Sequence, residues 1–181
     1  MRLVIASDIH GSALWGGALL DAFQRERAER LLLLGDILYH GPRNDLPEGY
    51  APRKVTALLN ACGAPILGVR GNCDAEIDQT VLNFPMMAEY CLLSAGTRTI
   101  FATHGHVFNT ATPPPLRRGD ILLHGHTHVP GWDSFGDGML CLNPGSVSLP
   151  KAGSPRGYML LTDREIVWKE LDGKEYHRLT L

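Results

Sequence analysis

The chain has 181 residues, of which 44% are hydrophobic, so we expect residues 1–181 to form a single domain with a buried core. The 17 lysines and arginines and 19 aspartates and glutamates give a formal net charge of −2. This balance provides no basic stripe and argues against the binding of long nucleic acids.

The cysteines and the hydrophobic segments indicate the cellular compartment in which we expect the protein. The chain has no C-x-x-C pair, and its cysteines are scattered at Cys62, Cys73, Cys91 and Cys141. That spacing predicts neither a disulfide framework nor a zinc knuckle and suits a reducing environment. The first apolar run is interrupted at Asp8, too early for a signal peptide, and no segment approaches the length that spans a bilayer. We therefore expect a cytoplasmic protein without a membrane partner.

The first half of the chain alternates strands with helices. An apolar strand at Leu3–Ala6 precedes a helix from about Ser12 to Arg27, for which Ser12 is a suitable N-cap. The next predicted elements are a strand at Leu31–Leu34, a helix at Arg53–Ala61, a strand at Pro65–Val69 and a short helix near Asp74–Gln79. The intervening loop, Tyr39–Pro52, is long and rich in glycine and proline, and loops of this length are usually functional. We expect it to act as a flap over a binding crevice.

Strands replace helices after Pro85. The predicted strands are Met87–Leu93, Arg98–Thr103, Ile121–Leu123, Gly131–Phe135, Met139–Leu142, Tyr158–Thr162, Ile166–Leu171 and Lys174–Leu181. Two face-to-face sheets with helices outside would bury this many strands, which predicts an α/β fold. The alternating apolar residues of the C-terminal edge strands also suggest a homo-oligomer.

Metal-binding side chains follow five of these strands, where each strand ends. They are Asp8 and His10, Asp36, Asn72, His104, and His126 with His128. Ligands of open α/β sheets bind beyond the carboxyl ends of the strands, so the pattern predicts a polynuclear metal site. Residues two apart in an extended chain point the same way, and we therefore expect His126 and His128 to converge on one point.

The motif order Asp8-x-His10, Gly35-Asp36, Gly71-Asn72-x-Asp74, His104 and Gly125-His126-x-His128 resembles the signature of the calcineurin-like metallophosphoesterases. The resemblance covers nearly the whole chain. The segments Arg70-Gly71-Asn72-Cys73-Asp74 and Asn143-Pro144-Gly145-Ser146 are similar to those of small bacterial YfcE-type phosphodiesterases. The resemblance implies a four-layer α/β/β/α sandwich of two mixed sheets flanked by helices.

The resemblance also implies a ligand set for two divalent ions. It assigns one ion to Asp8, His10 and His128, the other to Asn72, His104 and His126, and the bridging position to Asp36. Two cations about 3.5–4 Å apart need a shared anionic ligand, which one carboxylate can supply. Imidazole, carboxylate and amide ligands without thiolate suit Mn, Fe, Co, Ni or Zn. The resemblance favours Mn²⁺.

The implied activity is that of a phosphoric diester hydrolase acting on small phosphate esters. The two ions would lower the pKa of a bridging water toward about 7, and the hydroxide would attack phosphorus in line with the leaving group. Cys73 occupies the position where many family members carry a histidine that protonates the leaving oxygen. A thiol with a pKa near 8.5 is a poorer acid, so we expect activated diesters to be preferred.

Other residues have weaker signals. His106 could touch phosphate or support His104, and Asp74 would orient a neighbour. His124 belongs either to the core or behind a metal ligand. Phosphate binding is conceivable for Arg70, Arg117 and Arg118, although surface ion pairing is the default for such residues.

Two alternatives stay open at the level of the sequence. The same site could serve a phosphomonoesterase or a nuclease. The fold could also be a non-catalytic interaction scaffold, as in the retromer subunit that shares it, but all seven ligand positions carry competent ligand types.

Overall fold

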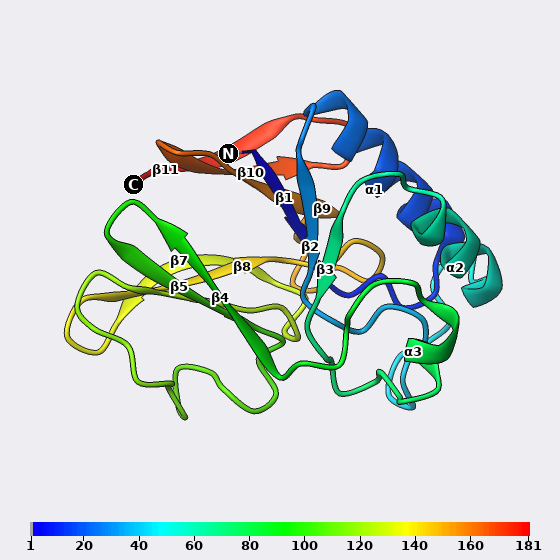
Figure 1. The fold of residues 1–181 in the computed structure, drawn as a ribbon, viewed down its shortest axis with the longest axis horizontal. Helices are drawn as coiled ribbons and strands as arrows, with labels where there is room; N and C mark the ends of the chain where they lie inside the picture. Colours follow the sequence, from blue (N-terminus) through cyan, green and yellow to red (C-terminus); the bar gives the residue numbers. More distant parts are fainter. Residues whose placement is uncertain (1) are drawn as a thin grey trace.

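Two β-sheets packed face to face form the centre of the molecule (Figure 1). The computed structural model describes residues 2–181. The strand orders are β11-β10-β9-β1-β2-β3 and β4-β5-β6-β8-β7. Each sheet contains both parallel and antiparallel pairs. The predicted fold class, two mixed sheets with flanking helices, is confirmed.

Three neighbouring strands of the first sheet run parallel, and its remaining pairs are antiparallel. Its strands are β1 (Leu3–Ala6), β2 (Arg30–Leu33), β3 (Ile66–Gly68), β9 (Gly157–Leu161), β10 (Glu165–Glu170) and β11 (Glu175–Thr180). All four side chains of β1 are buried, which is typical of a strand covered on both sides. Because β1, β2 and β3 run parallel, their carboxyl ends lie at one edge of the sheet.

Helices α1 (Ala13–Arg25) and α2 (Pro52–Asn60) cover the outer face of this sheet. Leu19 and Phe23 of α1 and Val55 of α2 share a core with Val4 of β1. The Ser12 side chain accepts a hydrogen bond from the Trp15 N–H at 3.2 Å, so the predicted N-cap is confirmed. The cap fixes the helix start directly after the Asp8–His10 turn.

The second sheet encloses a separate core together with the first. Its strands are β4 (Tyr90–Ala95), β5 (Arg98–Thr103), β6 (Ile121–Leu123), β7 (Pro130–Phe135) and β8 (Met139–Pro144). Ile5 and Leu32 of the first sheet pack in one cluster with Ile100, Leu123 and Leu142 of the second. Burial of these residues aligns the carboxyl ends of β5 and β6 with those of the first sheet.

The loop of residues 104–120 covers part of the outer face of the second sheet, and Leu92 of β4 stays exposed on that face. Phe108 from this loop stands edge-on to Tyr90 and Phe101, whose rings stack at 4.4 Å between centroids. Leu122 of β6 is fully buried as a result. In the part of the chain that the structure describes, this loop supplies the layer outside the second sheet.

Two predicted boundaries are wrong. The short helix is α3 (Asp78–Val81), not Asp74–Gln79, because the Asp74 carboxylate accepts backbone N–H groups of neighbouring loops. Strand β4 begins at Tyr90, not Met87. The preceding residues instead accept hydrogen bonds from β3 and the residues after it, with Gly68 donating to Pro85 and Arg70 to Ala88. No helix of residues 2–181 is long and apolar enough to cross a membrane.

Candidate metal centre

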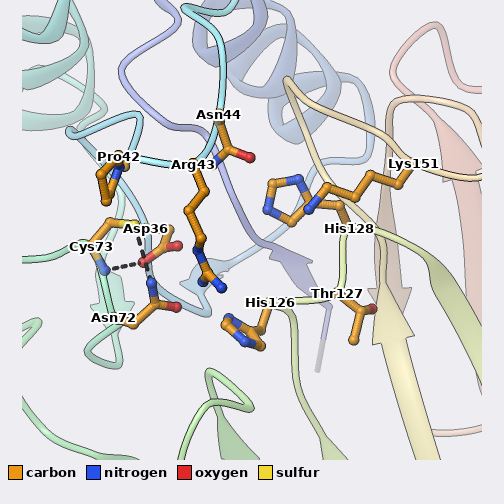
Figure 2. A pocket seen from close by; sticks show the side chains of 11 residues that line it. Asp36, Pro42, Arg43, Asn44, Asn72, Cys73, His126, Thr127, His128 and Lys151 are labelled. Atoms are coloured by element: carbon orange, nitrogen blue, oxygen red, sulfur yellow. Dashed lines mark hydrogen bonds between the residues drawn. The ribbon is translucent and has the colours of Figure 1, made fainter.

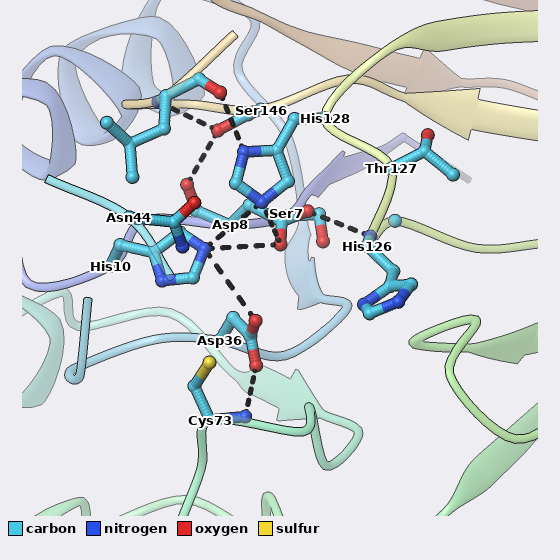
Figure 3. Close-up of polar contacts among 12 residues, drawn as sticks. Ser7, Asp8, His10, Asp36, Asn44, Cys73, His126, Thr127, His128 and Ser146 are labelled. Atoms are coloured by element: carbon cyan, nitrogen blue, oxygen red, sulfur yellow. Dashed lines mark hydrogen bonds and ion pairs between the residues drawn. The ribbon is translucent and has the colours of Figure 1, made fainter. Parts of the chain in front are cut away.

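All seven predicted ligands come together at one edge of the two sheets. Asp8 and His10 follow β1, Asp36 follows β2 and Asn72 follows β3, whereas His104, His126 and His128 come from the loops after β5 and β6. Figure 3 shows Asp8, His10 and His128 pointing toward one another, with Asp36 beside them. The sheet packing described above is therefore what assembles the site.

Sharp backbone turns aim these side chains. Among the described residues, five of the seven non-glycine residues with positive φ are predicted ligands: Asp8, His10, Asp36, His126 and His128, with φ of 60°, 48°, 54°, 66° and 62°. The left-handed conformation costs roughly 1–2 kcal/mol per residue, so the surrounding structure must hold it in place. Concentration of such residues at one point is typical of a functional site.

The first cluster contains Asp8, His10 and His128. The Asp8 Oδ1 atom lies 3.3 Å from His128 Nε2 and 3.6 Å from His10 Nε2. The two Nε2 atoms are 3.2 Å apart. Three potential donor atoms thus surround one small volume.

The second cluster contains Asn72, His104 and His126. His104 Nε2 lies 3.1 Å from Asn72 Oδ1 and 3.2 Å from His126 Nδ1. Asp36 stands between the clusters, because its Oδ2 atom is 3.6 Å from His10 Nε2 and 3.4 Å from His104 Nε2. This grouping is the one that the resemblance implied.

The prediction that His126 and His128 converge on one point is wrong. Both residues have left-handed backbones in a turn, and His128 joins the first cluster while His126 joins the second. The alternation rule applies to extended chain only. The turn instead distributes the two imidazoles over neighbouring sites.

The donor chemistry of the first cluster and of Asp36 and His104 fits metal ions. The Nδ1 atoms of His10, His104 and His128 lie 2.8, 2.6 and 2.6 Å from the backbone carbonyls of Tyr39, Leu34 and Leu149. Carbonyls accept hydrogen bonds only, so each Nδ1 carries a proton, and each Nε2 is the ring nitrogen that faces the cluster and would bind an ion as part of a neutral imidazole. The Asp8 Oδ1 atom is buried without a hydrogen-bond donor among the described residues. A cation would satisfy all of these atoms.

The electrostatics of the centre also favour a cation. Burial alone would raise the pKa of Asp8, but the neighbouring His10 and His128 side chains hold it far below its usual range. Burial lowers the pKa of His104, yet Asp36 and Asp8 outweigh it and raise that pKa to about 9. Two ionised carboxylates therefore make the centre strongly attractive to positive charge.

A second set of polar residues holds the ligand loops. The Asp74 carboxylate accepts hydrogen bonds from the Asp36 and Ile37 N–H groups, each at 2.8 Å, and from Gly71 at 2.7 Å. Asp74 thus fixes the loop that presents Asp36, which agrees with the expectation that it orients a neighbour.

The segment Asn143–Ser148 ties the second sheet to the first motif. The hydroxyls of Ser146 and Ser148 donate to the Asp8 carbonyl at 2.9 and 3.1 Å. The Asn143 amide donates to the Gly125 carbonyl at 2.8 Å and to Thr127 at 3.0 Å. Sequence reasoning assigned no role to these residues, although Asn143-Pro144-Gly145-Ser146 stood out as a motif.

The residues with weaker signals are placed as follows. Cys73 lies beside the centre, its N–H donating to Asp36 at 2.8 Å. Burial, reinforced by the charge of Asp36, raises the pKa of its thiol to about 12. His106 is exposed and touches the His104 ring edge-on at 5.4 Å. His124 is buried and bonds to Gly125 and Cys141, not to a predicted ligand, so it belongs to the core.

A cavity of about 380 Å³ opens onto the centre (Figure 2). One wall is formed by the predicted flap, through Gly41, Pro42, Arg43 and Asn44, and Lys151 lies on another. The proposed phosphate ligands Arg70, Arg117 and Arg118 do not line it. Sequence reasoning gave no role to Arg43 or Lys151, because only tertiary structure brings these distant loops to the site.

The chain is similar to known proteins over most of its length. The model of the calcineurin-like phosphoesterase superfamily domain matches residues 1–165. Phosphodiesterase YfcE of Escherichia coli K12 is 46% identical over 161 residues, which cover 89% of this chain and 87% of that protein. The probable metallophosphoesterase YsnB of Bacillus subtilis is 32% identical over 105 residues, 54% and 57% of the two chains.

Solved structures give the same result. The structure of YfcE, described as a phosphoesterase from E. coli, matches with a TM-score of 0.93 and 42% identity, covering 99% of this chain and 98% of that one. An archaeal phosphodiesterase at 23% identity shares the fold, with a TM-score of 0.59. Together with the ligand clusters, these matches show that the chain belongs to the calcineurin-like phosphoesterase superfamily and is a hydrolase of phosphate esters.

Proposed function

We propose that this protein is a phosphodiesterase that works with two divalent metal ions, Mn²⁺ in preference to Zn, Fe, Co or Ni. The observation that carries the proposal is the Asp36 carboxylate, whose Oδ2 lies between the two histidine clusters at 3.6 and 3.4 Å. One shared carboxylate is what a pair of closely spaced cations requires.

Each predicted ligand has a defined task in this proposal. Asp8, His10 and His128 hold one ion, and Asn72, His104 and His126 hold the other. When bound, the ions supply a water-derived nucleophile near neutral pH and neutralise charge on the phosphoryl oxygens. The carbonyls that fix the Nδ1 protons keep the imidazoles aimed at the ions, and Asp74 keeps Asp36 between them. His106 acts as a support for the His104 ring.

The name of a close relative favours diesters over monoesters, and the Cys73 thiol bears on which leaving groups suit the site. The relative that is 46% identical is named a phosphodiesterase. The raised pKa of Cys73 also keeps its thiol protonated and uncharged at neutral pH, so it neither attacks phosphorus nor readily gives up its proton to a leaving alkoxide. Leaving groups that depart without a proton suit such a site.

The remaining proposals concern the whole protein. We propose one domain over residues 1–181, a cytoplasmic location that suits four free thiols, and small phosphate esters rather than long nucleic acids as substrates. We also predict a homo-oligomer, and the molecular mass measured by light scattering would test this. The apolar residues Tyr176 and Leu179 of β11, part of the reason for it, pack against the core between the sheets.

The test is metal removal and reconstitution. Chelator-treated protein should not hydrolyse bis(p-nitrophenyl) phosphate, and Mn²⁺ should restore the activity best. Mutation of a residue that hydrogen-bonds to a metal ligand typically lowers metal affinity or activity by about 10–100-fold. Asp36 is itself a proposed ligand, so Asp36→Asn should lower activity by at least about 100-fold. Asp21→Asn, which removes an exposed carboxylate of α1, should leave activity unchanged. Full hydrolysis by protein shown to be metal-free by elemental analysis would refute the proposal.

A further inference from the structure

We propose that Arg43 and Lys151 form a second anion site in the cavity, which selects phosphodiesters that carry an additional phosphoryl group. This inference rests on the proposed function, because it concerns what else the substrate of that centre carries. The observation behind it is that two positive side chains in the cavity have no negative partner in the proposed reaction.

The two cations reach the same cavity from different loops. In Figure 2, Arg43 extends from the flap toward the middle of the cavity, and Lys151 extends from the opposite side past His128. Both side chains are exposed, and neither has an ion pair or a side-chain hydrogen bond within residues 2–181. They are therefore available to a ligand.

Hydrogen bonds hold the backbone of the loops that carry Arg43 and Lys151. The flap is anchored at its far end, where the Ser12 hydroxyl donates to the Glu48 carbonyl at 2.6 Å, and internally, where Asn44 donates to the His40 carbonyl at 2.7 Å. The Lys151 N–H donates to the carbonyl of the metal ligand His128 at 3.1 Å. The fold thus sets the positions of the two backbones beside the metal centre, and the side chains extend from there into the cavity.

The charge balance indicates what they bind. Two divalent ions carry four positive charges, and the carboxylates of Asp8 and Asp36 cancel two of them. The single charge of a diester and that of the attacking hydroxide cancel the other two. The charges of Arg43 and Lys151 in the same cavity are then not neutralised. Asp36, already counted, is the one carboxylate among the residues that line the cavity.

A phosphate monoester group matches these two charges best. It carries close to two negative charges at pH 7, whereas a carboxylate carries one. Its oxygens suit the fork of an arginine and the point charge of a lysine. A cavity of about 380 Å³ is within the range that encloses a small organic ligand, so a second group fits beside the reacting one.

The experiment compares two substrates with the same leaving group. Thymidine 5′-(p-nitrophenyl phosphate) and its 3′-phosphorylated counterpart differ by the additional phosphoryl group alone. With Mn²⁺-loaded protein, kcat/KM should be about tenfold higher for the 3′-phosphorylated ester, since partly exposed ion pairs contribute modestly. The preference should shrink as ionic strength rises.

Variants connect the preference to the two cations. Arg43→Gln/Lys151→Gln should reduce the tenfold preference to about twofold, mainly by slowing the 3′-phosphorylated ester. The control is Lys54→Gln/Arg117→Gln, which removes the same charges from α2 and from the outer side of the second sheet and should keep the preference. Equal kcat/KM values for the two esters with the wild type, or an equal loss on both esters in the first variant, would overturn the inference.

Binding gives a readout that is independent of turnover. By calorimetry, thymidine 3′,5′-bisphosphate should bind the Mn²⁺-loaded protein about tenfold more tightly than thymidine 5′-phosphate, and Arg43→Gln/Lys151→Gln should reduce the difference to about twofold. If neither ester is hydrolysed while this difference is present, the proposed function fails and the anion site stands. If both esters are hydrolysed and the two nucleotides bind equally, the anion site alone fails.

Discussion

Cys73 is the residue at which this site departs from the family pattern. Its N–H holds Asp36, and its side chain lies beneath the flap, where a Cβ placed on Gly41 would meet the sulfur at 2.7 Å. Burial and the charge of Asp36 keep the thiol protonated by raising its pKa to about 12. In the proposed mechanism this position lies next to the leaving group and holds a poor proton donor.

Cys73→His should therefore broaden the range of leaving groups. A well-placed general acid contributes about 10²–10⁴-fold, so diesters with alkyl leaving groups should gain at least about tenfold even if the ring is misaligned by the flap. Esters of p-nitrophenol should change little, because that leaving group needs no proton. The ratio of the two rates measures the effect, and Cys73→Ser serves as the control. Parallel losses on both substrate classes, with normal metal content, would show that the residue only packs.

At the scale of single residues, the sequence predicted which side chains lie together better than the directions in which they point. Motif order and strand ends were sufficient to select seven residues that the structure brings to one place, because parallel strands bring their carboxyl ends together. The resemblance implied the separation of His126 from His128, whereas the alternation rule predicted the opposite, since the separation depends on two left-handed residues that no side-chain pattern encodes. Arg43 and Lys151 had no local signal, because their role depends on loops distant in sequence.

Between elements, the site depends on the close approach of two loops. Gly71, after β3, packs against the loop after β2 so tightly that a Cβ would collide with the Asp36 carboxylate and backbone. Its φ is not in the left-handed region, so space rather than conformation requires glycine here. The distance between the loops, and with it the position of the bridging carboxylate, is set by this residue.

Gly71→Ala should consequently lower metal content and reduce activity by at least about 100-fold, because Asp36 must move. Overpacking should also cost about 1–3 kcal/mol in the free energy of unfolding. Gly17→Ala is the matched control. A Cβ there meets nothing within 4 Å inside α1, and the change should stabilise the protein by about 0.5–1 kcal/mol with activity unchanged. Urea unfolding measures the stability of the two variants, and elemental analysis measures their metal content. Normal Mn²⁺ content in Gly71→Ala would contradict the role given to Gly71.

Most elements were predicted from periodicity, and the errors have local causes. The helix near residue 74 was displaced because Asp74 serves the Asp36 loop, an interaction between residues 38 apart in sequence. Strand β4 was predicted too early because the apolar run before it lies along β3 instead. Hydrophobic pattern indicates that a segment is buried but not which neighbour its backbone joins.

Across the whole molecule, Glu26 connects the end of α1 to the first sheet. Its carboxylate accepts hydrogen bonds from Tyr158 of β9 at 2.7 Å and from Lys169 of β10 at 2.6 Å, with Arg2 at 3.3 Å. Burial would raise the pKa of Glu26, but these partners lower it below its ordinary value. A lowered carboxyl pKa means that the ionised form stabilises the fold.

Glu26→Gln should cost about 2 kcal/mol in the free energy of unfolding at pH 7, a typical value for a hydrogen-bonded charge. The wild-type contribution is complete above the unfolded-state pKa near 4.5 and is lost as pH falls through the lower folded-state pKa. Urea unfolding at pH 7 and pH 3 should therefore show the difference between wild type and variant shrinking at pH 3. A difference that does not depend on pH would contradict this account.

Metal ions should stabilise the molecule as a whole, because the ligands come from both sheets. Free Mn²⁺ at 100 times its dissociation constant adds about 2.7 kcal/mol to folding stability. For a protein of this size, that corresponds to an increase in Tm of roughly 5–10 °C. Thermal scans at increasing Mn²⁺ measure the shift, and Asp36→Asn should abolish it. An equal shift in that variant would mean that the ions bind elsewhere.

The division of ligands between the sheets also has a consequence for biogenesis. Residues up to Asn72 supply four of the seven predicted ligands, and the other three, all histidines, come from His104 onward. A nascent chain emerging from the ribosome therefore has no complete site until His128 is available and the second sheet has docked. Under the proposed function, acquisition of the metal pair would therefore be a late event in folding, and a chain truncated within β6 would leave synthesis without its cofactor.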